Sequence, residues 1–194
     1  MRQPASKEQT MRLFAAVPLP GTIAGELEEW ARKQKSRLSF RKWVHPQDYH
    51  ITLQFLGDTP ASKTAALQTA LGGVRGGAFR LSLNGAGTFG SPNAPRVLWA
   101  GVAGELERLI ALHSAVANAT GPLGFALEER PYAPHITLAR TFSSGNASAP
   151  MPEGATADAP SGMQWEADRF VLMRTHMHAS PMYEVIGEFP LREA

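Results

Sequence analysis

The chain has 194 residues, 43% of them hydrophobic, and a formal net charge of +2, so it is long enough for one sizeable domain or two small lobes that share a core. The absence of cysteine excludes disulfides and thiolate metal sites, and the small net charge predicts no strong electrostatic field for nucleic acid. Because no apolar run has the length of a membrane span and the first residues lack a signal-peptide pattern, we expect a cytoplasmic protein.

The first half of the chain alternates between strand and helix patterns. Residues 1–10 are polar and show no periodicity, so we expect a disordered, dispensable extension there and a single domain over residues 11–194. Two-residue alternation and helical spacing of apolar residues then predict successive elements. These are strands at 11–18, 40–44 and 50–55 and helices at 22–37 and 62–71, the last with Ser62 as N-cap.

The second half repeats this plan loosely. The patterns predict strands at 79–83, 96–102, 135–141, 165–175 and 183–191, a helix at 105–119, a turn at 84–85, and loops at 87–93 and 142–162, the latter mobile. The order of elements predicts an α+β protein that contains two related antiparallel sheets.

The tetrapeptide His-Ile-Thr-Leu occurs twice, at residues 50–53 and 135–138. Side chains two residues apart on a strand share a face, so each copy places a histidine and a threonine together. Strict alternation in the first copy also predicts that Gln54 joins the polar face and that Phe55 joins the apolar face. Two such strands that face one another would bring two imidazoles and two hydroxyls to one site.

This set of residues suits phosphodiester chemistry without a metal. Histidine can serve as general acid or general base because its unperturbed pKa lies near working pH. The hydroxyls of Thr52 and Thr137 could donate to phosphate oxygens, and Arg140 is the nearest guanidinium. Strict alternation, however, places Arg140 on the face opposite His135. A bulge or an early strand end is needed for Arg140 to reach a phosphate; otherwise it would form a structural salt bridge.

The chain resembles the RNA 2',3'-cyclic phosphodiesterases, also called 2'-5' RNA ligases, of the two-histidine (2H) phosphoesterase superfamily. The resemblance rests on segments that follow the family's order along nearly the whole chain from Met11. They are Met11-Arg12-Leu13-Phe14, Trp43-Val44 with Tyr49-His50-Ile51-Thr52-Leu53-Gln54-Phe55-Leu56-Gly57, Pro95-Arg96-Val97-Leu98-Trp99, and Arg130-Pro131-Tyr132 with Pro134-His135-Ile136-Thr137-Leu138-Ala139-Arg140.

The resemblance implies a bilobal fold with two pseudo-symmetric antiparallel sheets and flanking helices around a central cleft. It also implies metal-independent opening of RNA 2',3'-cyclic phosphate ends to 2'-phosphomonoesters, with no cofactor. By position, His50 would protonate the departing 3'-oxygen and His135 would activate water, while Thr52, Thr137 and Arg140 would hold the phosphate.

Several other residues admit two interpretations. Phe14 and Tyr132 adjoin the expected site and could stack on a base or ribose. His176 and His178 could be imagined as metal ligands with the motif histidines, but an exposed pair at a strand end fits the sequence better. His113 lies on the apolar side of a helix and should be a packed histidine.

The sequence leaves alternative functions open. The same acid–base pair could form or cleave 2'-5' linkages, or open the cyclic phosphate of a small nucleotide. A non-catalytic module that binds RNA ends would not require both histidines and both threonines, and a metal-dependent hydrolase would be sensitive to a chelator. We expect RNA ends or small cyclic nucleotides as substrate, no obligatory protein partner and a monomer.

Overall fold

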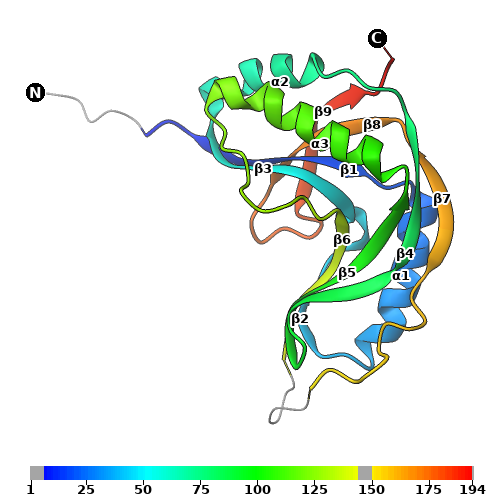
Figure 1. The fold of residues 1–194 in the computed structure, drawn as a ribbon. Coiled ribbons are helices and arrows are strands. Elements are labelled where there is room, and N and C mark those ends of the chain that lie inside the picture. The colour runs from blue at the N-terminus through cyan, green and yellow to red at the C-terminus, as the bar shows by residue number, and fades with distance from the viewer. Residues whose placement is uncertain (1–6, 144–149, 194) are drawn as a thin grey trace, which may run out of the picture.

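The computed structural model describes residues 7–143 and 150–193, which form strands, three α-helices and short 3-10 turns (Figure 1). The strands are β1 (Thr10–Pro18), β2 (Phe40–Trp43), β3 (His50–Pro60), β4 (Phe79–Ser91), β5 (Ala94–Gly104), β6 (His135–Phe142), β7 (Ser161–Ala167), β8 (Arg169–Thr175) and β9 (Tyr183–Pro190). The helices are α1 (Gly21–Lys35), α2 (Thr64–Gly72) and α3 (Leu106–Thr120). None of the helices in the described part of the chain is long and apolar enough to cross a membrane.

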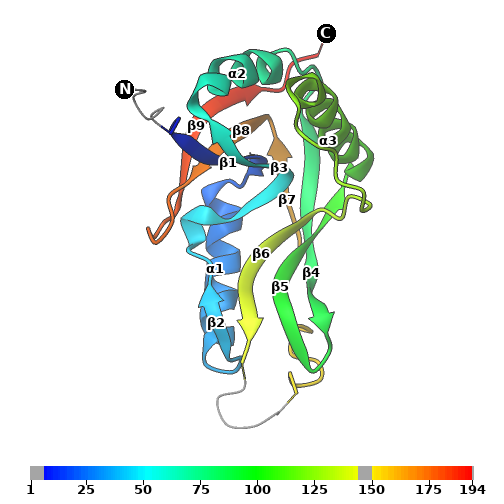
Figure 2. The ribbon, with the colours of Figure 1, turned by 90° about the vertical axis from the view of Figure 1, so that its left-hand side faces the viewer.

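The strands form one curled antiparallel sheet with the order β7-β4-β5-β6-β3-β1-β8-β9, and β2 pairs with β6 beside β3. The motif strands β3 and β6 lie at its centre (Figure 2) and pair only at Ile51 and Ile136. The strands on the β3 side make the first lobe and those on the β6 side the second. The expected bilobal α+β fold is therefore confirmed, with its two sheets continuous through one residue pair.

The two lobes share a structural unit of strand, helix and motif strand. In the first unit β1 leads through α1 to β3, and in the second β5 leads through α3 to β6. Both helices have 15 residues, and each motif strand pairs antiparallel with the strand that precedes its helix. This repetition extends the internal duplication beyond the two tetrapeptides.

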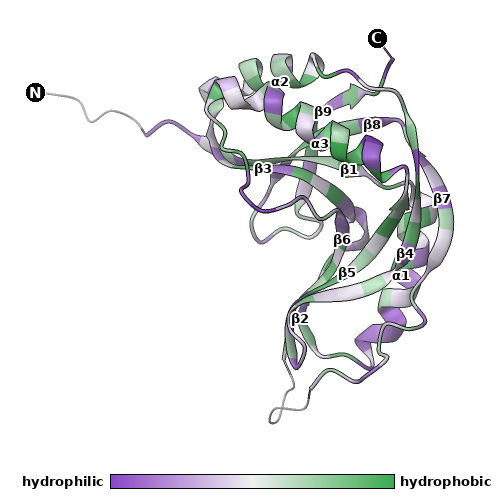
Figure 3. Cartoon of the chain, in the orientation of Figure 1, coloured by the Kyte–Doolittle hydropathy of each residue, from purple (hydrophilic) through white to green (hydrophobic). Residues whose placement is uncertain are grey.

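The helices cover the sheet through amphipathic faces. Figures 1 and 2 show α2 and α3 side by side at one end of the molecule, with α1 lying apart from them. Each helix carries both hydrophobic and hydrophilic segments (Figure 3), and its apolar side chains join the main core. In α1 these are Ile23, Leu27, Trp30 and Ala31. A separate small cluster on the opposite face of β1 and β8 contains Phe14, Ala16, Val171 and Met173.

Each motif strand carries a β-bulge at the leucine of its tetrapeptide. Thr52 pairs with Ala16 and Gln54 with Ala15, so that Leu53 is the extra residue. Likewise Thr137 pairs with Trp99 and Ala139 with Leu98, so that Leu138 is the extra residue. A bulge shifts the alternation of side chains by one residue. The fifth residue after each histidine therefore returns to the histidine's face.

The first bulge corrects two predictions of strict alternation. Gln54 is 5% exposed, and its amide oxygen accepts a hydrogen bond of 2.7 Å from the Thr120 hydroxyl at the end of α3. Phe55, expected in the core, is instead 59% exposed on the face of His50 and Thr52.

Other boundaries differ locally from the predictions. Strand β4 continues through the expected turn, because Asn84 and Gly85 form a bulge opposite β5 and Gly85 has a φ of +68°. The expected strand over 165–175 is two strands, β7 and β8, that separate at Asp168. Helix α2 begins after a 3-10 turn, at Thr64 rather than at Ser62, and has no side-chain cap.

The polar N-terminal segment is partly placed. Residues 1–6 lie outside the described residues, so their expected disorder stays a prediction. Thr10 already pairs with Pro60 in the sheet, so the strand begins one residue before the predicted position. The carboxylate of Glu8 and the carbonyl of Gln9 accept hydrogen bonds from the backbone N–H groups of Ser62 and Ala61. Of the predicted loop, residues 144–149 also lie outside the described part, and residues 150–160 contain only turns and irregular backbone.

The bond between Thr120 and Gln54 predicts a measurable cost for its loss. Thr120→Val keeps the volume of the side chain but leaves the buried amide oxygen of Gln54 without this donor. We expect the free energy of unfolding to fall by about 1–3 kcal/mol. Denaturant titration measures this change, and Thr69→Val, an exposed threonine of α2, is the matched control. A change no larger than that of the control would contradict the role of this bond.

Candidate functional site

The pairing of Ile51 with Ile136 brings the two motifs together on one face of the sheet. Around this antiparallel pair, the register sets Thr52 across from His135 and His50 across from Thr137. We call the face that carries these four side chains the site face. All four are half-buried, whereas both isoleucines point to the other face and are fully buried. The expected convergence of the two tetrapeptides is therefore present, with approximate twofold symmetry.

Both histidines are held by the same hydrogen bond. Nδ1 of His50 lies 2.7 Å from the carbonyl oxygen of Asp48, and Nδ1 of His135 lies 2.7 Å from the carbonyl oxygen of Ala133. A carbonyl oxygen can only accept, so each Nδ1 carries the proton. In the neutral ring, Nε2 then has the free lone pair. This anchor gives both histidines the same tautomer and a fixed orientation.

The ring of His50 is enclosed by two aromatic side chains. Phe14 of β1 lies with its ring centre 4.8 Å away, and Tyr183 of β9 packs edge-on at 5.3 Å. Nε2 of His50 is 2.9 Å from the Thr52 hydroxyl, which donates to the neutral ring. The two aromatic rings also contact each other at 4.8 Å. The first histidine is therefore closely packed on the side of Phe14 and Tyr183.

This enclosure changes the acidity of His50. Burial lowers its pKa from the ordinary 6.5 to about 4, although the hydrogen bond to the Asp48 carbonyl and the Asp48 charge act in the opposite direction. The positive charge of Arg140, and that of His135 in its protonated form, lower the pKa further. The register of the sheet and the second bulge place both side chains on the same face as His50. His50 is consequently neutral at pH 7 in the free protein.

Asp48 links the first histidine to a distant part of the chain. It lies in the short 3-10 turn between β2 and β3 and is only 3% exposed. Its carboxylate accepts hydrogen bonds from the backbone N–H groups of Met182, at 2.9 Å, and Tyr183, at 3.2 Å. One residue thus orients the His50 ring through its carbonyl and holds the Tyr183 segment against that ring through its side chain.

The second histidine has a more open environment. Phe89 of β4 contacts the His135 ring edge-on at 5.0 Å and also contacts Trp99 at 5.3 Å. Trp99 lies flat over Gly87, where a Cβ atom would come within 2.5 Å of the indole ring. A glycine at this position therefore lets the tryptophan lie close to the sheet below Phe89.

The second bulge places Arg140 on the site face, as the prediction of a phosphate contact required. Arg140 pairs with Val97 of β5 and is exposed. It occupies the same place in the second motif as Phe55 in the first. Among the described residues Arg140 forms no ion pair, so the alternative of a structural salt bridge finds no support in that part of the chain.

A pocket of about 460 Å³ opens directly beside the four motif side chains. Thr52 and His135 form its inner edge, and Phe55, Phe89 and Tyr132 supply aromatic walls. Arg96, Glu128 and Arg130 add charged groups to its lining. A largely apolar pocket with a few polar groups at one end is typical of sites for small organic ligands.

The two residues predicted to stack on a base are committed to other contacts. Phe14 is 2% exposed, so it supports His50 and offers no free face. The Tyr132 hydroxyl donates to the backbone carbonyl of Thr52 at 2.8 Å, and one face of its ring is stacked on His113 at 4.0 Å. The other residues of the site, Phe55, Asp48 and Tyr183, were not predicted. The exposed position of Phe55 could have been inferred from its equivalence to Arg140.

The remaining histidine pair forms no metal site within the described chain. Nε2 of His176 lies 2.6 Å from a carboxylate oxygen of Glu184, and His178 is exposed in the turn between β8 and β9. Among the residues that the structure describes, no group of three or more histidine, aspartate or glutamate side chains is arranged to hold a metal ion.

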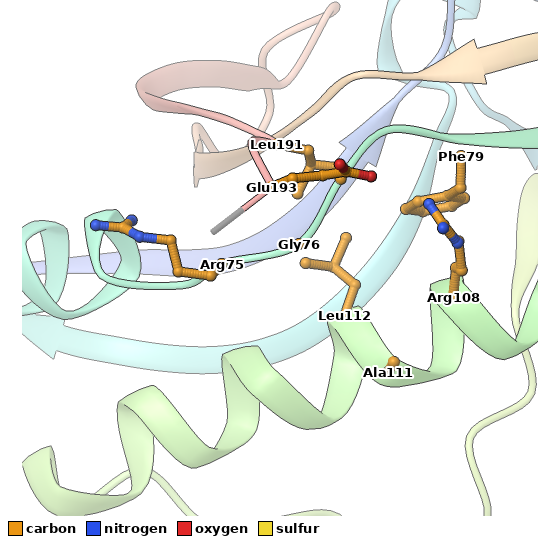
Figure 4. Close-up of a pocket in the computed structure, with 9 residues that line it drawn as sticks. Arg75, Gly76, Phe79, Arg108, Ala111, Leu112, Leu191 and Glu193 are labelled. Atoms are coloured by element: carbon orange, nitrogen blue, oxygen red, sulfur yellow. The ribbon is translucent and has the colours of Figure 1, made fainter.

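A second pocket, of about 250 Å³, lies away from the motifs between α3 and the C-terminal segment (Figure 4). Its lining includes Arg75, Arg108 and Glu193. The Arg75 guanidinium points away from Glu193 in Figure 4 and donates to backbone carbonyls beside α2, while Arg108 donates to the carbonyl of Ala78. None of the lining residues belongs to a motif strand, so this pocket is separate from the histidine site.

Comparison with known families agrees with this geometry. The family model described as LigT like phosphoesterase matches the chain twice, at residues 17–99 and 101–183. The chain belongs to this family. Two matches in tandem also agree with the repeated unit of strand, helix and motif strand.

Two curated relatives carry the name RNA 2',3'-cyclic phosphodiesterase. The protein from Geobacillus stearothermophilus is 42% identical over 181 residues, which cover 92% of this chain and 56% of that protein. The protein from Bacillus subtilis is 36% identical over 188 residues, 92% of this chain and 95% of that protein. The chain therefore spans just over half of the first relative and nearly all of the second.

Solved structures of the family show the same fold. The crystal structure of Escherichia coli LigT with 3'-AMP matches with a TM-score of 0.76 at 27% identity and covers 95% of this chain and 99% of that one. The crystal structure of TT0787 from Thermus thermophilus matches with a TM-score of 0.73 at 32% identity, with 94% and 99% coverage.

The lowered pKa of His50 predicts a pH dependence of stability. Between pH 6.5 and about 4 the unfolded chain protonates this residue and the folded protein does not, so the free energy of unfolding falls as the pH is lowered through this window. In His50→Gln this contribution is absent, and the fall between about pH 6.5 and 4.5 should be smaller than in the parent. Urea unfolding at the two pH values measures the difference. Equal falls would show that His50 titrates normally.

The two bonds of the Asp48 carboxylate predict a specific loss in Asp48→Asn. The amide has the same shape but only one acceptor atom, so one of the two N–H groups loses its partner. At a cost of about 1–3 kcal/mol, the melting temperature should fall by about 3–10 °C. Asp58→Asn is the control, because among the described residues that exposed carboxylate pairs with Arg12 alone, and its loss should change stability by less than ~1 kcal/mol. Similar melting temperatures for both variants would contradict the assignment.

Proposed function

We propose that this protein hydrolyses RNA ends that bear a 2',3'-cyclic phosphate to 2'-phosphomonoesters without a metal ion. The observation that carries the proposal is the pair of histidines with identical anchors, each with Nε2 left for proton transfer beside a threonine hydroxyl. Hydrolysis of a phosphodiester needs one group to activate water and another to protonate the leaving oxygen. A twofold arrangement of histidines can place these groups on opposite sides of one phosphorus atom.

We assign the proton donor to His50 and the base to His135. Nε2 of the half-buried His135 is free of protein partners in the described chain, which leaves it open to a water molecule. His50 is neutral in the free protein, so it must take up a proton as the substrate binds. The negative charge of the phosphate raises the pKa of a neighbouring imidazole, which supplies this change.

Protonation of His50 also frees the Thr52 hydroxyl. In the neutral site this hydroxyl donates to Nε2 of His50. Once Nε2 carries a proton, it becomes a donor, and the Thr52 hydroxyl can turn its hydrogen to a phosphate oxygen. Thr137 and the Arg140 guanidinium would hold the remaining non-bridging oxygens and offset their charge. Substrate binding and acid activation are thereby coupled.

The aromatic pocket beside Thr52 and His135 would hold the nucleoside. Its volume of about 460 Å³ suits one base and ribose, and Phe55 has an exposed ring in the wall. We therefore place base stacking on Phe55 rather than on the buried Phe14, with the free face of Tyr132 as a second wall.

The names of the relatives support RNA as the substrate, and the 3'-AMP in the E. coli structure supports a nucleotide site in that protein. We further propose that the protein acts in the cytoplasm as a monomer and needs no protein partner. The basis is the absence of cysteine and the fact that both motifs come from one chain.

The first test is turnover of adenosine 2',3'-cyclic phosphate and of an RNA oligonucleotide with the same end, in the presence of a chelator. His50→Ala and His135→Ala should each lower the rate by about 10²- to 10⁴-fold while the fold persists. His178→Ala, an exposed histidine outside the site, is the matched control. Loss of activity with the chelator, a 3'-phosphate product, or near-normal turnover of either motif variant would overturn the proposal.

A second test separates the two histidines. A substrate with an activated leaving group, such as a nitrophenyl ester, needs no proton on departure. It should partly restore turnover in His50→Ala but not in His135→Ala, as measured by release of nitrophenolate. Equal rescue of both variants would contradict the assigned roles.

A further inference from the structure

We propose that Lys42 forms a second phosphate subsite, which binds the phosphate on the 5' side of the terminal nucleotide. This inference rests on the proposed function, because it assumes that the cyclic phosphate lies at the histidines. The subsite would distinguish between substrates that make the same contacts with the motif residues. A nucleotide with a phosphate on its 5'-oxygen, such as the 3'-terminal nucleotide of an RNA strand with its phosphodiester link, would be preferred over one that ends in a 5'-hydroxyl.

The register of the sheet places Lys42 beside Arg140. In the antiparallel pair of β2 and β6, Lys42 lies directly opposite Arg140. Side chains of directly opposed residues project from the same face of a sheet. Because the bulge at Leu138 puts Arg140 on the site face, Lys42 is on the site face too.

A side-chain contact supports this position independently. Nζ of Lys42 lies 3.8 Å from the sulfur of Met182, the residue before Tyr183. Met182 is held by the Asp48 carboxylate, and Tyr183 packs on His50. The Lys42 ammonium therefore lies beside the wall of the histidine site.

Lys42 has no counter-ion in the described part of the chain. Its contact is with a thioether, which is only a weak acceptor and cannot neutralise an ammonium. Lys42 and Arg140 thus place two adjacent positive charges on the site face, and neither forms an ion pair among the described residues. A cyclic phosphate carries a single negative charge, which Arg140 alone can match. The second cation is then available for a second phosphate.

The order of the aromatic pocket, Arg140 and Lys42 across the site face matches the order of base, cyclic phosphate and 5'-phosphate at the 3' end of an RNA strand. Across the strands the site face presents Phe89 on β4, Val97 on β5, Arg140 on β6 and Lys42 on β2. The aromatic pocket reaches Val97 and lies on one side of Arg140, whereas Lys42 lies on the other. With the base in the pocket and the cyclic phosphate at Arg140, the 5'-phosphate would extend towards Lys42.

The direct test compares two product-like ligands that differ only in the 5'-phosphate, namely 2'-AMP and adenosine 2',5'-bisphosphate. Isothermal titration calorimetry should show that the parent protein binds the bisphosphate about three- to tenfold more tightly. In Lys42→Gln this ratio should fall to about one. Raising the salt concentration should reduce the parent's ratio, because dissolved ions screen the attraction between the exposed ammonium and the 5'-phosphate.

Arg41 provides a matched control because it neighbours Lys42 on the same strand. Arg41 is likewise exposed, but in the register of the two strands Lys42, and not Arg41, lies opposite Arg140. Arg41→Gln removes the same charge and should keep the preference for the bisphosphate. A ratio near one in the parent, or equal losses in both variants, would overturn the subsite.

Two arginines of the aromatic pocket are the competing candidates. If Arg96→Gln or Arg130→Gln abolished the preference and Lys42→Gln retained it, the 5'-phosphate would lie on the pocket side and the proposal would be wrong. Because these measurements use binding, they remain informative whatever the turnover. Lack of hydrolysis of an RNA oligonucleotide that ends in a 2',3'-cyclic phosphate would refute the proposed function, whereas equal binding of the two ligands would refute only the subsite.

Discussion

The pairing of Ile51 with Ile136 is the constraint on which the site depends. It is the one position at which the two central strands are joined in the described structure, and both side chains are completely buried. A slip of one residue would exchange the faces of every neighbouring side chain, so that the isoleucines would point to the site and the histidines into the core. The free energy of burying two large apolar side chains therefore fixes the register of the four polar residues on the site face.

The second constraint is the bulge that follows each histidine and threonine. Without it Arg140 would lie on the far face, and the positive charge that lowers the pKa of His50 would be absent from the site. The bulge also explains why a polar glutamine is buried and a phenylalanine exposed at consecutive positions of β3. In the first copy these two residues continue a regular polar–apolar alternation, so only comparison with the second copy reveals the irregularity.

Much of this arrangement could be predicted from the two tetrapeptides, because alternation and repetition are local properties. The convergence of the histidines and threonines follows from the two tetrapeptides. Strict alternation would put Arg140 on the face opposite His135, so a phosphate contact by Arg140 required a bulge. The same reasoning applied to the first copy would have placed Phe55 correctly. The enclosure of His50 could not be predicted in this way. Tyr183 reaches it from the other end of the chain, and the bonds between Asp48 and the backbone at Met182 and Tyr183 depend on main-chain groups that no residue pattern records.

The two motifs differ at the fifth residue after the histidine, and this difference has a consequence for the orientation in which a nucleotide binds. A site built from two identical lobes would bind a cyclic phosphate in two orientations, related by the twofold axis, with the same free energy. Each orientation would present a different ribose oxygen to a given histidine, so neither histidine would have a fixed role. Joining the two copies in one chain allowed one lobe to keep an aromatic ring, Phe55, where the other has a guanidinium, Arg140. This difference between the lobes would give the two binding orientations different free energies, so that each histidine could keep one role.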